Sequence, residues 1–449
     1  MFALNSDTRS PSRVALLALV LALLGSASML YYHLELFIPR SLELRASIGL
    51  GNGYSFGNDF YQVWLTSREC VRSGSDPYSA AMTQKIQTGL YGRTLDRAIP
   101  TDPIDQRRFP YPIFTDLLFW PATRFSFELA RVALLCLLIP LTAGTVLLWL
   151  CVLDWRLPWN WVAVLLSLTL CSYPALEALY ALQLGLIVAF LLAASILALQ
   201  RARFLIAGIL MALTTIKPQV TLLVIFYVLL WSLSDLRRRR NYCVGLFTTL
   251  IVLVGGSLAV WPNWIYSWIH GILAYRSYTP PPLLTEILTR PLGARVSGRA
   301  TLLLFAGSMI WAAILAWRNR NAAATSPAFL LTLGLLLSLT TIALLSGQAV
   351  YDHLVLLPGI LLLLRHRSKI LCAGSVPRIL AAAGAAVLFW PWVAAFALIT
   401  LRPLMTTAFF FSAAVFALPI RTAASLPFAV LALLAYVKKL NLADNREAA

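Results

Sequence analysis

The chain has 449 residues, of which 60% are hydrophobic and 12% are charged, and its mean hydropathy is +0.78. This composition excludes an ordinary soluble protein and predicts an all-α, polytopic integral membrane protein. The formal net charge of +18 would suit a nucleic-acid-binding protein, but the Lys and Arg residues lie mostly in short breaks between apolar stretches and in the first long loop. That distribution is typical of membrane topology signals, so we expect contacts with membrane lipids and no nucleic acid.

The first apolar stretch, residues 14–32, follows Arg9 and Arg13. It is long for the core of a signal peptide and lacks a clean small-residue cleavage site, so we interpret it as an uncleaved first span that leaves the cytoplasm. Residues 33–128 then form a first extracytoplasmic loop. Because unstructured loops of this length are uncommon, we expect it to carry interfacial helices and functional residues.

An amphipathic run lies between two polar motifs of this loop, Gly-Asn-Asp-Phe-Tyr at 57–61 and Gly-Ser-Asp-Pro-Tyr at 74–78. Its apolar residues fall near helical spacing: Phe60, Val63, Trp64 and Val71. We predict a helix whose apolar face lies on the bilayer surface, with Asp59 kept ionised by the free N–H groups at the N-terminal end. The alternative is that Asp59 only caps this helix and that Asp76 and Pro77 only begin the next one.

The loop ends in a Phe-Pro-Tyr-Pro motif at 109–112 and an apolar run at 113–120. This run is too short to cross the bilayer, so we predict a re-entrant or interfacial helix. Three spans follow, at residues 129–153, 161–180 and 184–199.

The next apolar stretch, residues 204–234, is too long for one span and is interrupted by Lys217 and Pro218. Proline disfavours a continuous helix, and a charged residue needs a partner inside hydrocarbon. We therefore divide the stretch into two short spans that meet at an outer corner. The basic run Arg237–Arg240 follows inside, as a topology anchor rather than a regulatory lipid-binding patch.

The rest of the chain predicts further spans around a second outer loop at residues 263–300, which is rich in Trp, Tyr and Pro. These spans are residues 244–260, 301–317, 328–345, 354–364 and 380–401. Residues 404–437 are either one long tilted span or two short ones broken by Pro419 and Arg421. We expect twelve spans, or thirteen in the second case, in a single integral membrane domain of residues 1–449 in the plasma (inner) membrane.

The outer ends of the predicted spans collect polar residues from separate parts of the sequence: Asp59, Arg107, Arg108, Glu177, Gln183, Lys217, Gln219, Gln348, Tyr351, Asp352 and His353. Together they offer a base for a hydroxyl group, cations for a phosphate and an aromatic wall for a sugar. Lys217 marks a functional site by default because it is a charge in an apolar stretch, although its ammonium group could instead reach the interface. Arg107 and Arg108 could bind a phosphate or lipid headgroups.

Several other kinds of site are not indicated. The sequence has no Gly-rich phosphate loop, no Cys/His cluster and no Asp-x-Asp pair in the first loop. We therefore expect neither a metal nor a cofactor, and no nucleotide-sugar chemistry.

Five short motifs follow one another between residues 57 and 358. They are Asp-Phe at 59–60, Gly-x-Asp-Pro-Tyr at 74–78, Phe-Pro-Tyr-Pro at 109–112, Lys-Pro-Gln at 217–219 and Tyr-Asp-His at 351–353. In this order they resemble the polyprenol-phosphate-sugar-dependent glycosyltransferases of GT-C architecture, specifically the mannosyltransferase-like family 87. The sequence departs mildly from that family at residues 111–113, where it has Tyr-Pro-Ile and the family often has Tyr-Pro-Pro.

The resemblance implies an inverting transferase that moves a hexose, often mannose, from a polyprenyl-phosphate donor to a hydroxyl group of a lipid or glycan acceptor at the outer face. Asp59 would deprotonate the acceptor, and His353 would assist it or bind a sugar hydroxyl. Lys217, together with Arg108, would hold the donor phosphate. The residues expected at the sugar and the acceptor are Tyr351, Gln219 and Gln183.

Alternatives remain for the late motif and for the whole chain. Tyr351–His353 could be an ordinary polar helix end with Asp352 as its N-cap. A transporter would place ionisable residues at span centres and show paired broken helices or inverted repeats. A non-catalytic protein of envelope biogenesis would tolerate the loss of Asp59 and Lys217.

Overall fold

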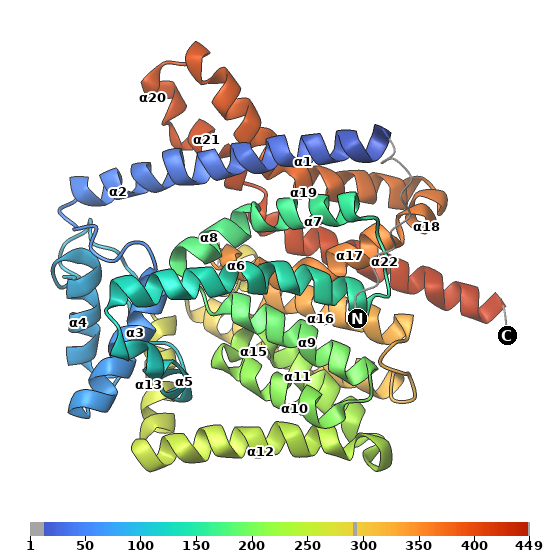
Figure 1. The fold of residues 1–449 in the computed structure, drawn as a ribbon, viewed down its shortest axis with the longest axis horizontal. Helices are drawn as coiled ribbons and strands as arrows, with labels where there is room; N and C mark the ends of the chain where they lie inside the picture. The colour runs from blue at the N-terminus through green and yellow to red at the C-terminus, as the bar shows by residue number, and fades with distance from the viewer. Residues whose placement is uncertain (1–12, 291–293, 448–449) are drawn as a thin grey trace.

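The structure is a computed structural model that describes residues 13–290 and 294–447. The named elements in these residues are all helical, as predicted. Most long helices run roughly along one direction, and α3, α4 and α5 form a group of shorter helices at one end (Figure 1). Six of the described helices are long and apolar enough to cross a membrane, or seven if the bent pair α7 and α8 counts as one span. The chain is therefore a polytopic membrane protein.

The first span continues further than the sequence predicts. Helix α1 (Arg13–Tyr31) runs through a π-helical segment (Tyr32–Phe37) into α2 (Ile38–Ser47), giving one helical stretch of 35 residues. Pro39 does not end it because it lies in the first turn of α2, where a missing N–H group is tolerated. Residues 33–47, predicted as loop, are thus helical. Arg9, which helped to orient this span, lies outside the described residues.

The first loop carries helices, as predicted: α3 (Asn58–Ser73), α4 (Ala80–Tyr91), α5 (Phe114–Phe119) and the 3-10 helix η2 (Trp120–Arg124). The apolar face of α3 does not lie open to the bilayer, however. Phe60, Val63 and Trp64 are buried, since α3 packs against α5 and η2. Only Val71 at its far end is exposed. The predicted surface helix is therefore a packed part of the protein.

The second span is confirmed as α6 (Phe127–Val152), but the third is broken. Helices α7 (Trp159–Leu170) and α8 (Tyr173–Ala181) are bent by 56°. Ser172 caps α8 by accepting a hydrogen bond from the Ala175 N–H, and Pro174 occupies its first turn, so a new helix begins there. This bend brings the C-terminal part of α8 against α3.

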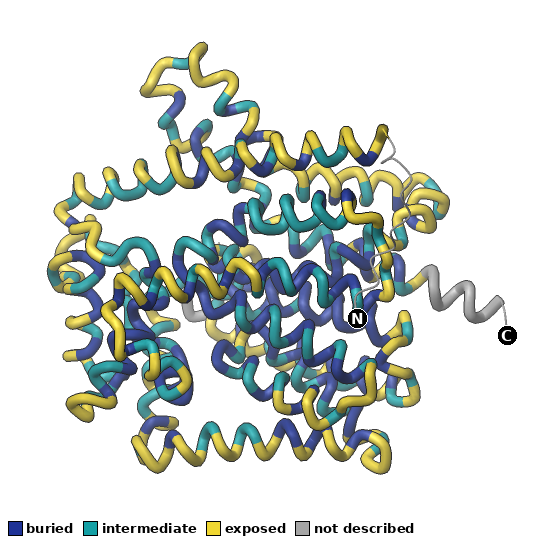
Figure 2. Tube along the Cα trace, viewed as in Figure 1, coloured by how far each residue is buried: buried dark blue, intermediate teal, exposed yellow. Residues whose placement is uncertain are grey.

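The break at Lys217 is confirmed. Helix α9 (Gly185–Gln200) is followed by α10 (Phe204–Leu213), a 3-10 turn at Thr214–Ile216, and α11 (Pro218–Leu233). Each is shorter than the 18 residues of a full candidate span. Figure 2 shows these short helices as the buried centre of the molecule, with the long helices α1 and α12 around them.

The second half adds these helices: α12 (Leu236–Val260), α13 (Trp264–Arg276), α14 (Leu283–Thr289), α15 (Ala294–Arg318), α16 (Pro327–Ala343), η4 (Val350–Leu356), α17 (Leu357–Arg365), α18 (Arg367–Cys372), α19 (Ser375–Leu401) and α22 (Leu426–Glu447). Residues 354–364, predicted as a span, form the end of η4 and most of α17, which has only 9 residues and is too short to cross a membrane by itself. Residues 404–437 form neither predicted arrangement: short helical turns, α20 (Thr407–Phe410) and α21 (Ala413–Phe416) among them, precede the single long helix α22. The count of twelve or thirteen crossings stays a prediction.

One residue of the basic run at the start of α12, Arg239, holds neighbouring helices together. Arg239 is buried, and its guanidinium donates to the backbone carbonyls of Trp231 (2.5 Å) and Arg320 (3.1 Å). The same group lies 3.6 Å from the centre of the Trp231 ring. Arg239 therefore joins the end of α11 to the turn after α15, whereas the side chain of Arg238 is 86% exposed. The run does more than anchor the topology.

Candidate active site

A polar cavity of about 120 Å³ lies beside α3. Its lining comes from distant parts of the chain: Asp59, Gln62, Asp105, Arg107, Arg108, Pro110, Tyr111, Gln183, Ile216, Lys217, Pro218, Gln219, Tyr275 and Tyr351. Six of the seven residues predicted for the site are among them. The structure therefore brings together residues that the sequence analysis grouped only by their expected side of the membrane.

Asp59 lies in the first turn of α3 but does not cap the helix. The N-cap is Gly57, with a left-handed backbone (φ 80°), and no side chain makes a cap hydrogen bond there. The Asp59 carboxylate instead accepts hydrogen bonds from Arg107 (Nη1 to Oδ1, 3.1 Å) and from the Gln183 side-chain amide. The capping interpretation of Asp59 is thus wrong.

Burial dominates the electrostatics of this carboxylate. It raises the pKa of Asp59 above its ordinary value, while the positive charges of Arg107 and Lys217 act in the opposite direction. The expectation that the free N–H groups of the helix end keep Asp59 ionised is therefore incomplete, because burial favours its protonated form. A carboxylate with a raised pKa is a stronger general base.

Lys217 is held inside the protein rather than extended to the interface. Its ammonium group donates to Asp352 Oδ1 (2.6 Å) and to Gln183 Oε1 (2.8 Å), and it lies 4.8 Å from the centre of the Tyr351 ring. The side chains of Lys217 and Asp352 are only 6% and 1% exposed. A buried charge is stable only when it is paired in this way, so the snorkelling alternative fails.

One hydrogen-bonded chain connects these groups. Asp352 accepts from Lys217, Lys217 donates to the Gln183 carbonyl oxygen, and the Gln183 amide donates to Asp59. Gln183 can make both contacts because Leu182, before it, adopts a left-handed backbone (φ 54°) at the end of α8. Such strained backbone is often found at functional sites. Asp352 serves as a partner of Lys217, and no side-chain cap of η4 is formed.

Gly185 leaves the space that this ion pair needs. A Cβ atom at that position would overlap Asp352 Oδ1 and lie 3.7 Å from Lys217 Nζ. The first residue of α9 is therefore required to be glycine by the carboxylate that packs against it. Nothing in the local sequence reveals this requirement.

The two arginines of the first loop differ in their contacts. Arg107 has a left-handed backbone (φ 54°) and is bound by Asp59, by the Tyr91 hydroxyl (3.1 Å) and by Asp105 (3.7 Å). Arg108 lines the cavity, and in the described part of the chain its side chain makes no hydrogen bond or ion pair. Arg108 is therefore the cation that is free to bind a ligand.

Tyr351 and Gln219 also line the cavity, as predicted. The sequence analysis missed Tyr275, Tyr111 and Asp105. The richness of the second outer loop in Trp and Tyr indicated an interface, and Tyr275 comes from this loop. No local signal singled out Asp105.

His353 does not line the cavity. Its side chain is buried, and its Nδ1 atom has no hydrogen-bond partner among the described residues. Burial lowers the pKa of His353 to about 4, which keeps the ring neutral at physiological pH.

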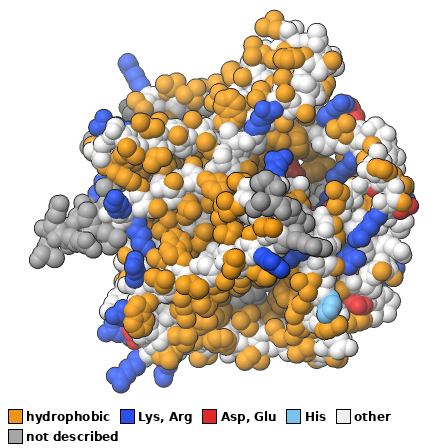
Figure 3. Space-filling view, turned by 180° about the vertical axis from the view of Figure 1, so that it is seen from behind, with side chains coloured by type: hydrophobic (Ala, Val, Ile, Leu, Met, Phe, Trp, Pro, Cys, Tyr) orange, Lys and Arg blue, Asp and Glu red, His pale blue; other side chains and the backbone are white. Residues whose placement is uncertain are grey.

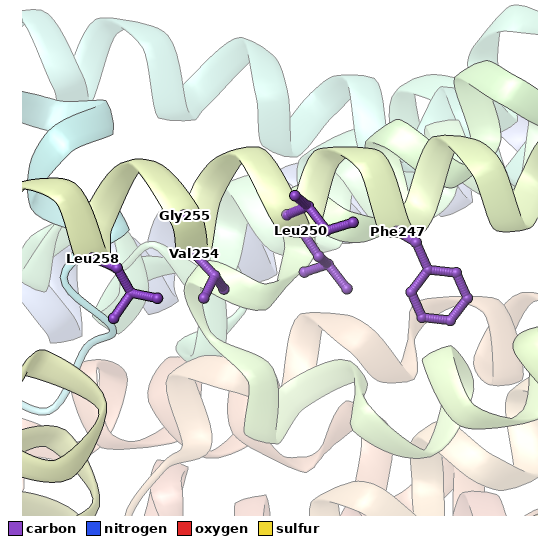
Figure 4. Close-up of a pocket in the computed structure, with 6 residues that line it drawn as sticks. Phe247, Leu250, Val254, Gly255 and Leu258 are labelled. Atoms are coloured by element: carbon purple, nitrogen blue, oxygen red, sulfur yellow. The ribbon is translucent and has the colours of Figure 1, made fainter. Parts of the chain in front are cut away.

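A second hollow is purely apolar. It is lined by residues of α12 alone: Phe247, Leu250, Ile251, Val254, Gly255 and Leu258 (Figure 4). These residues offer no group for acid–base chemistry or phosphate binding. Of these two hollows, the polar cavity is therefore the candidate site for the chemistry.

Comparison with known proteins shows the family of the chain. The model of Glycosyltransferase family 87 matches residues 109–347, which is more than half of the chain and includes Gln183, Lys217 and Tyr275. No curated protein and no solved structure matches the chain. The family is one of enzymes, so neither the transporter nor the non-catalytic alternative holds. The chain belongs to glycosyltransferase family 87.

Proposed function

We propose that the protein transfers a hexose, with mannose as the first candidate, from a polyprenyl-phosphate donor to an acceptor hydroxyl group with inversion of configuration. The observation that carries this proposal is the cavity itself. A buried carboxylate, Asp59, and two cations, Lys217 and Arg108, line one small polar space. These are the groups that activation of a hydroxyl and departure of a phosphate require.

The phosphate would be bound by Lys217 and Arg108. An ammonium group has three N–H donors, and two of those on Lys217 are used by Asp352 and Gln183. The third remains for a ligand in the cavity that Lys217 lines. Arg108 contributes a guanidinium group, which is well suited to two phosphate oxygens. Both cations would stabilise the negative charge that develops as the phosphate leaves.

Asp59 would act as the general base. The acceptor oxygen forms a bond to the anomeric carbon as the bond from that carbon to the phosphate oxygen breaks. The acceptor proton moves to Asp59, and the bonding electron pair leaves with the phosphate. Of the two Asp59 oxygens, each accepts one hydrogen bond from the protein, so lone pairs remain for the incoming hydroxyl. A single displacement of this kind inverts the anomeric configuration.

The sugar would lie against aromatic side chains. Tyr351, Tyr275 and Tyr111 line the cavity, and Gln219 adds an amide for a sugar hydroxyl. The polyprenyl chain would remain in the bilayer beside the apolar surface, while the phosphosugar enters the polar end of the molecule. We place this end on the extracytoplasmic face of the plasma (inner) membrane.

Substitution of the base and of the phosphate cation tests the proposal. Asp59→Asn keeps the shape of the side chain but removes its basicity, so transfer should fall roughly a hundredfold to ten-thousandfold. Lys217→Ala should lower it by about a hundredfold, the effect of a lost charge-assisted bond in a buried site, and Lys217→Arg should retain part of the activity. The measurement is transfer of labelled hexose from polyprenyl-phosphate hexose by the purified protein to a membrane lipid extract.

Arg238→Gln is the control. The Arg238 side chain is 86% exposed, lies at the N-terminal end of α12 and does not line the polar cavity. It should transfer hexose at the wild-type rate. Wild-type turnover in Asp59→Asn at equal protein levels would remove Asp59 as the base. Absence of turnover with every polyprenyl-phosphate hexose in the wild-type protein would reject the donor class.

A further inference from the structure

A second group of polar and aromatic residues lies outside the cavity, around His33. This residue belongs to the π-helical segment Tyr32–Phe37 between α1 and α2. Its side chain is completely buried, and in the described residues neither ring nitrogen makes a hydrogen bond of full geometry, the Leu176 backbone being only a weak partner. A buried polar group that is so poorly paired is costly, and π-helical segments occur frequently at functional sites. The group therefore calls for a functional explanation.

The nearest charged group is Glu177 on α8. Its Oε2 atom lies 3.7 Å from His33 Nε2, a contact that is too long for a hydrogen bond. The Glu177 side chain is 29% exposed, and in the described residues its carboxylate accepts no hydrogen bond. One of its faces thus contacts a buried imidazole while another is open to a ligand.

Aromatic rings surround this pair. The His33 ring is stacked on Phe37 at 5.8 Å and meets Tyr173 and Tyr180 edge-on at 6.0 and 6.2 Å. Tyr180 also packs against Phe56 at 5.8 Å, and both of these rings are partly exposed. A carboxylate bordered by partly exposed aromatic rings offers hydrogen-bond acceptors together with flat apolar surfaces. A sugar or polyol ring matches both, because its hydroxyl groups donate hydrogen bonds and its C–H face packs on an aromatic ring.

The group is connected to the catalytic base. The Tyr180 carbonyl accepts a hydrogen bond of 2.8 Å from the Gly57 N–H, two residues before Asp59. The Asp59 and Glu177 carboxylates are close enough to repel each other, and Asp59 is attracted to Lys217. The base therefore lies within range of both the cationic cavity and the Glu177 group, as a base between a donor and an acceptor must.

We infer that Glu177, positioned by His33, binds the hydroxyl groups of the acceptor, and that this acceptor carries a sugar or polyol ring. Glu177 would accept hydrogen bonds from adjacent hydroxyls, and Tyr180 and Phe56 would pack against the ring face. His33 is buried and acts only through Glu177, so it is a positioning residue. The inference rests on the proposed transferase function and assigns the acceptor class to it.

The experiment separates use of the donor from use of the acceptor. The full-length protein is given polyprenyl-phosphate hexose, first without an acceptor, so that hydrolysis reports transfer to water, and then with octyl mannoside or with octanol as the acceptor probe. Glu177→Gln should raise KM for octyl mannoside roughly tenfold or more, since a charge-assisted bond is weakened. Donor hydrolysis and transfer to octanol should stay within about twofold of wild type.

His33→Gln should raise the same KM by a smaller factor and leave kcat unchanged, which a general loss of structure would not do. The control is Glu43→Gln, whose carboxylate is 66% exposed on α2. Binding of octyl mannoside is followed in parallel by saturation-transfer NMR, which needs no turnover. Unchanged KM and unchanged binding in a Glu177→Gln protein that still hydrolyses the donor would overturn the inference. Glu177-dependent binding in a wild-type protein that neither hydrolyses nor transfers hexose from any polyprenyl-phosphate hexose would support this subsite and reject the proposed function instead.

Discussion

Charge balance in the cavity depends on a few buried side chains. Lys217 faces Asp352, and Arg107 faces Asp59 and Asp105, so most charges in the site already have partners. Arg108 is the cation without a charged partner in the described residues. In the proposed reaction, the donor phosphate would therefore meet one free guanidinium and one fixed ammonium group, rather than a cluster of mobile cations. Fixed charges require no reorganisation during the reaction, which is how such groups lower a barrier.

The acid limb of the pH–rate profile should report Asp59. The base is active when it is deprotonated, and burial raises its pKa, so activity should be lost, as the pH falls, at a higher pH than the ordinary aspartate pKa of about 3.9. Arg107→Gln removes a charge that lowers this pKa, so the limb should move to still higher pH. The measurement is kcat/KM for the donor from pH 4 to 8. A limb that does not move in Arg107→Gln would mean that another group is titrating.

Gly185 should be as important as the charged residues near it. In Gly185→Ala the new Cβ overlaps Asp352 and separates it from Lys217, and a disturbed buried ion pair commonly costs several kcal/mol. We expect the transfer rate to fall by roughly ten- to a hundredfold. Gly271→Ala is the matched control, because its Cβ would meet only Tyr78 at an ordinary 3.8 Å. Equal activity of the two variants, measured as hexose transfer, would show that the space at Gly185 is not needed.

Helix breaks, rather than helix lengths, build the site at the level of elements. Lys217 follows α10 and the 3-10 turn Thr214–Ile216, Leu182 ends α8 with a left-handed backbone, and Gly57 begins α3 in the same conformation. Each break turns a polar side chain toward the cavity. Since an interrupted helix leaves backbone groups unpaired, such breaks occur at membrane depth only where they are buried in protein or line a cavity.

How much of this could be predicted differs between elements. The break at Lys217 and the helix after Gly57 follow from a proline, a charge and a local periodicity, and the structure confirms both. The bend between α7 and α8 was missed although Ser172 and Pro174, which begin α8, are visible in the sequence. The short α17 was missed because its sequence is as apolar as that of a true span. Asp105 and Gly185 were missed for another reason: they matter only through contacts with distant residues, which no local pattern records.

Close packing of α10 against α12 should tolerate no large side chain at Gly245. A Cβ atom there would overlap the Leu205 carbonyl oxygen, because the two backbones are in direct contact. Gly245→Leu should therefore lower the thermal midpoint in detergent markedly, as overpacking commonly costs about 1–3 kcal/mol or more. Gly255→Leu lies on the same helix, but its Cβ would meet nothing within 4 Å. It should leave the midpoint unchanged or raise it, because leucine is the better helix former. A similar fall in both variants would contradict the packing argument.

The whole molecule is polarised from end to end. On the face shown in Figure 3, apolar side chains cover the middle, Lys and Arg gather at one edge, and acidic and basic side chains mix at the opposite edge. Helix α1 begins at, and α22 runs toward, the same end of the molecule (Figure 1). This pattern suits a protein whose basic end stays in the cytoplasm and whose mixed end carries the chemistry. The donor's lipid chain could then remain in the bilayer throughout the reaction.

Cysteine labelling tests this orientation. By the positive-inside pattern, the turns at Arg201, Arg318 and Arg367 are cytoplasmic, and the loop that carries Asp59 is extracytoplasmic. In intact cells, a reagent that cannot cross the membrane should modify a cysteine at the partly exposed Ser75, in the turn between α3 and α4, and should modify one at Arg320 only after permeabilisation. The six native cysteines are replaced first so that each signal has one source. Labelling of the cysteine at Arg320 but not of the one at Ser75 would show that the orientation in the membrane is the opposite of the predicted one. The site would then face the cytoplasm, and the extracytoplasmic reaction proposed for Asp59 would have to be abandoned.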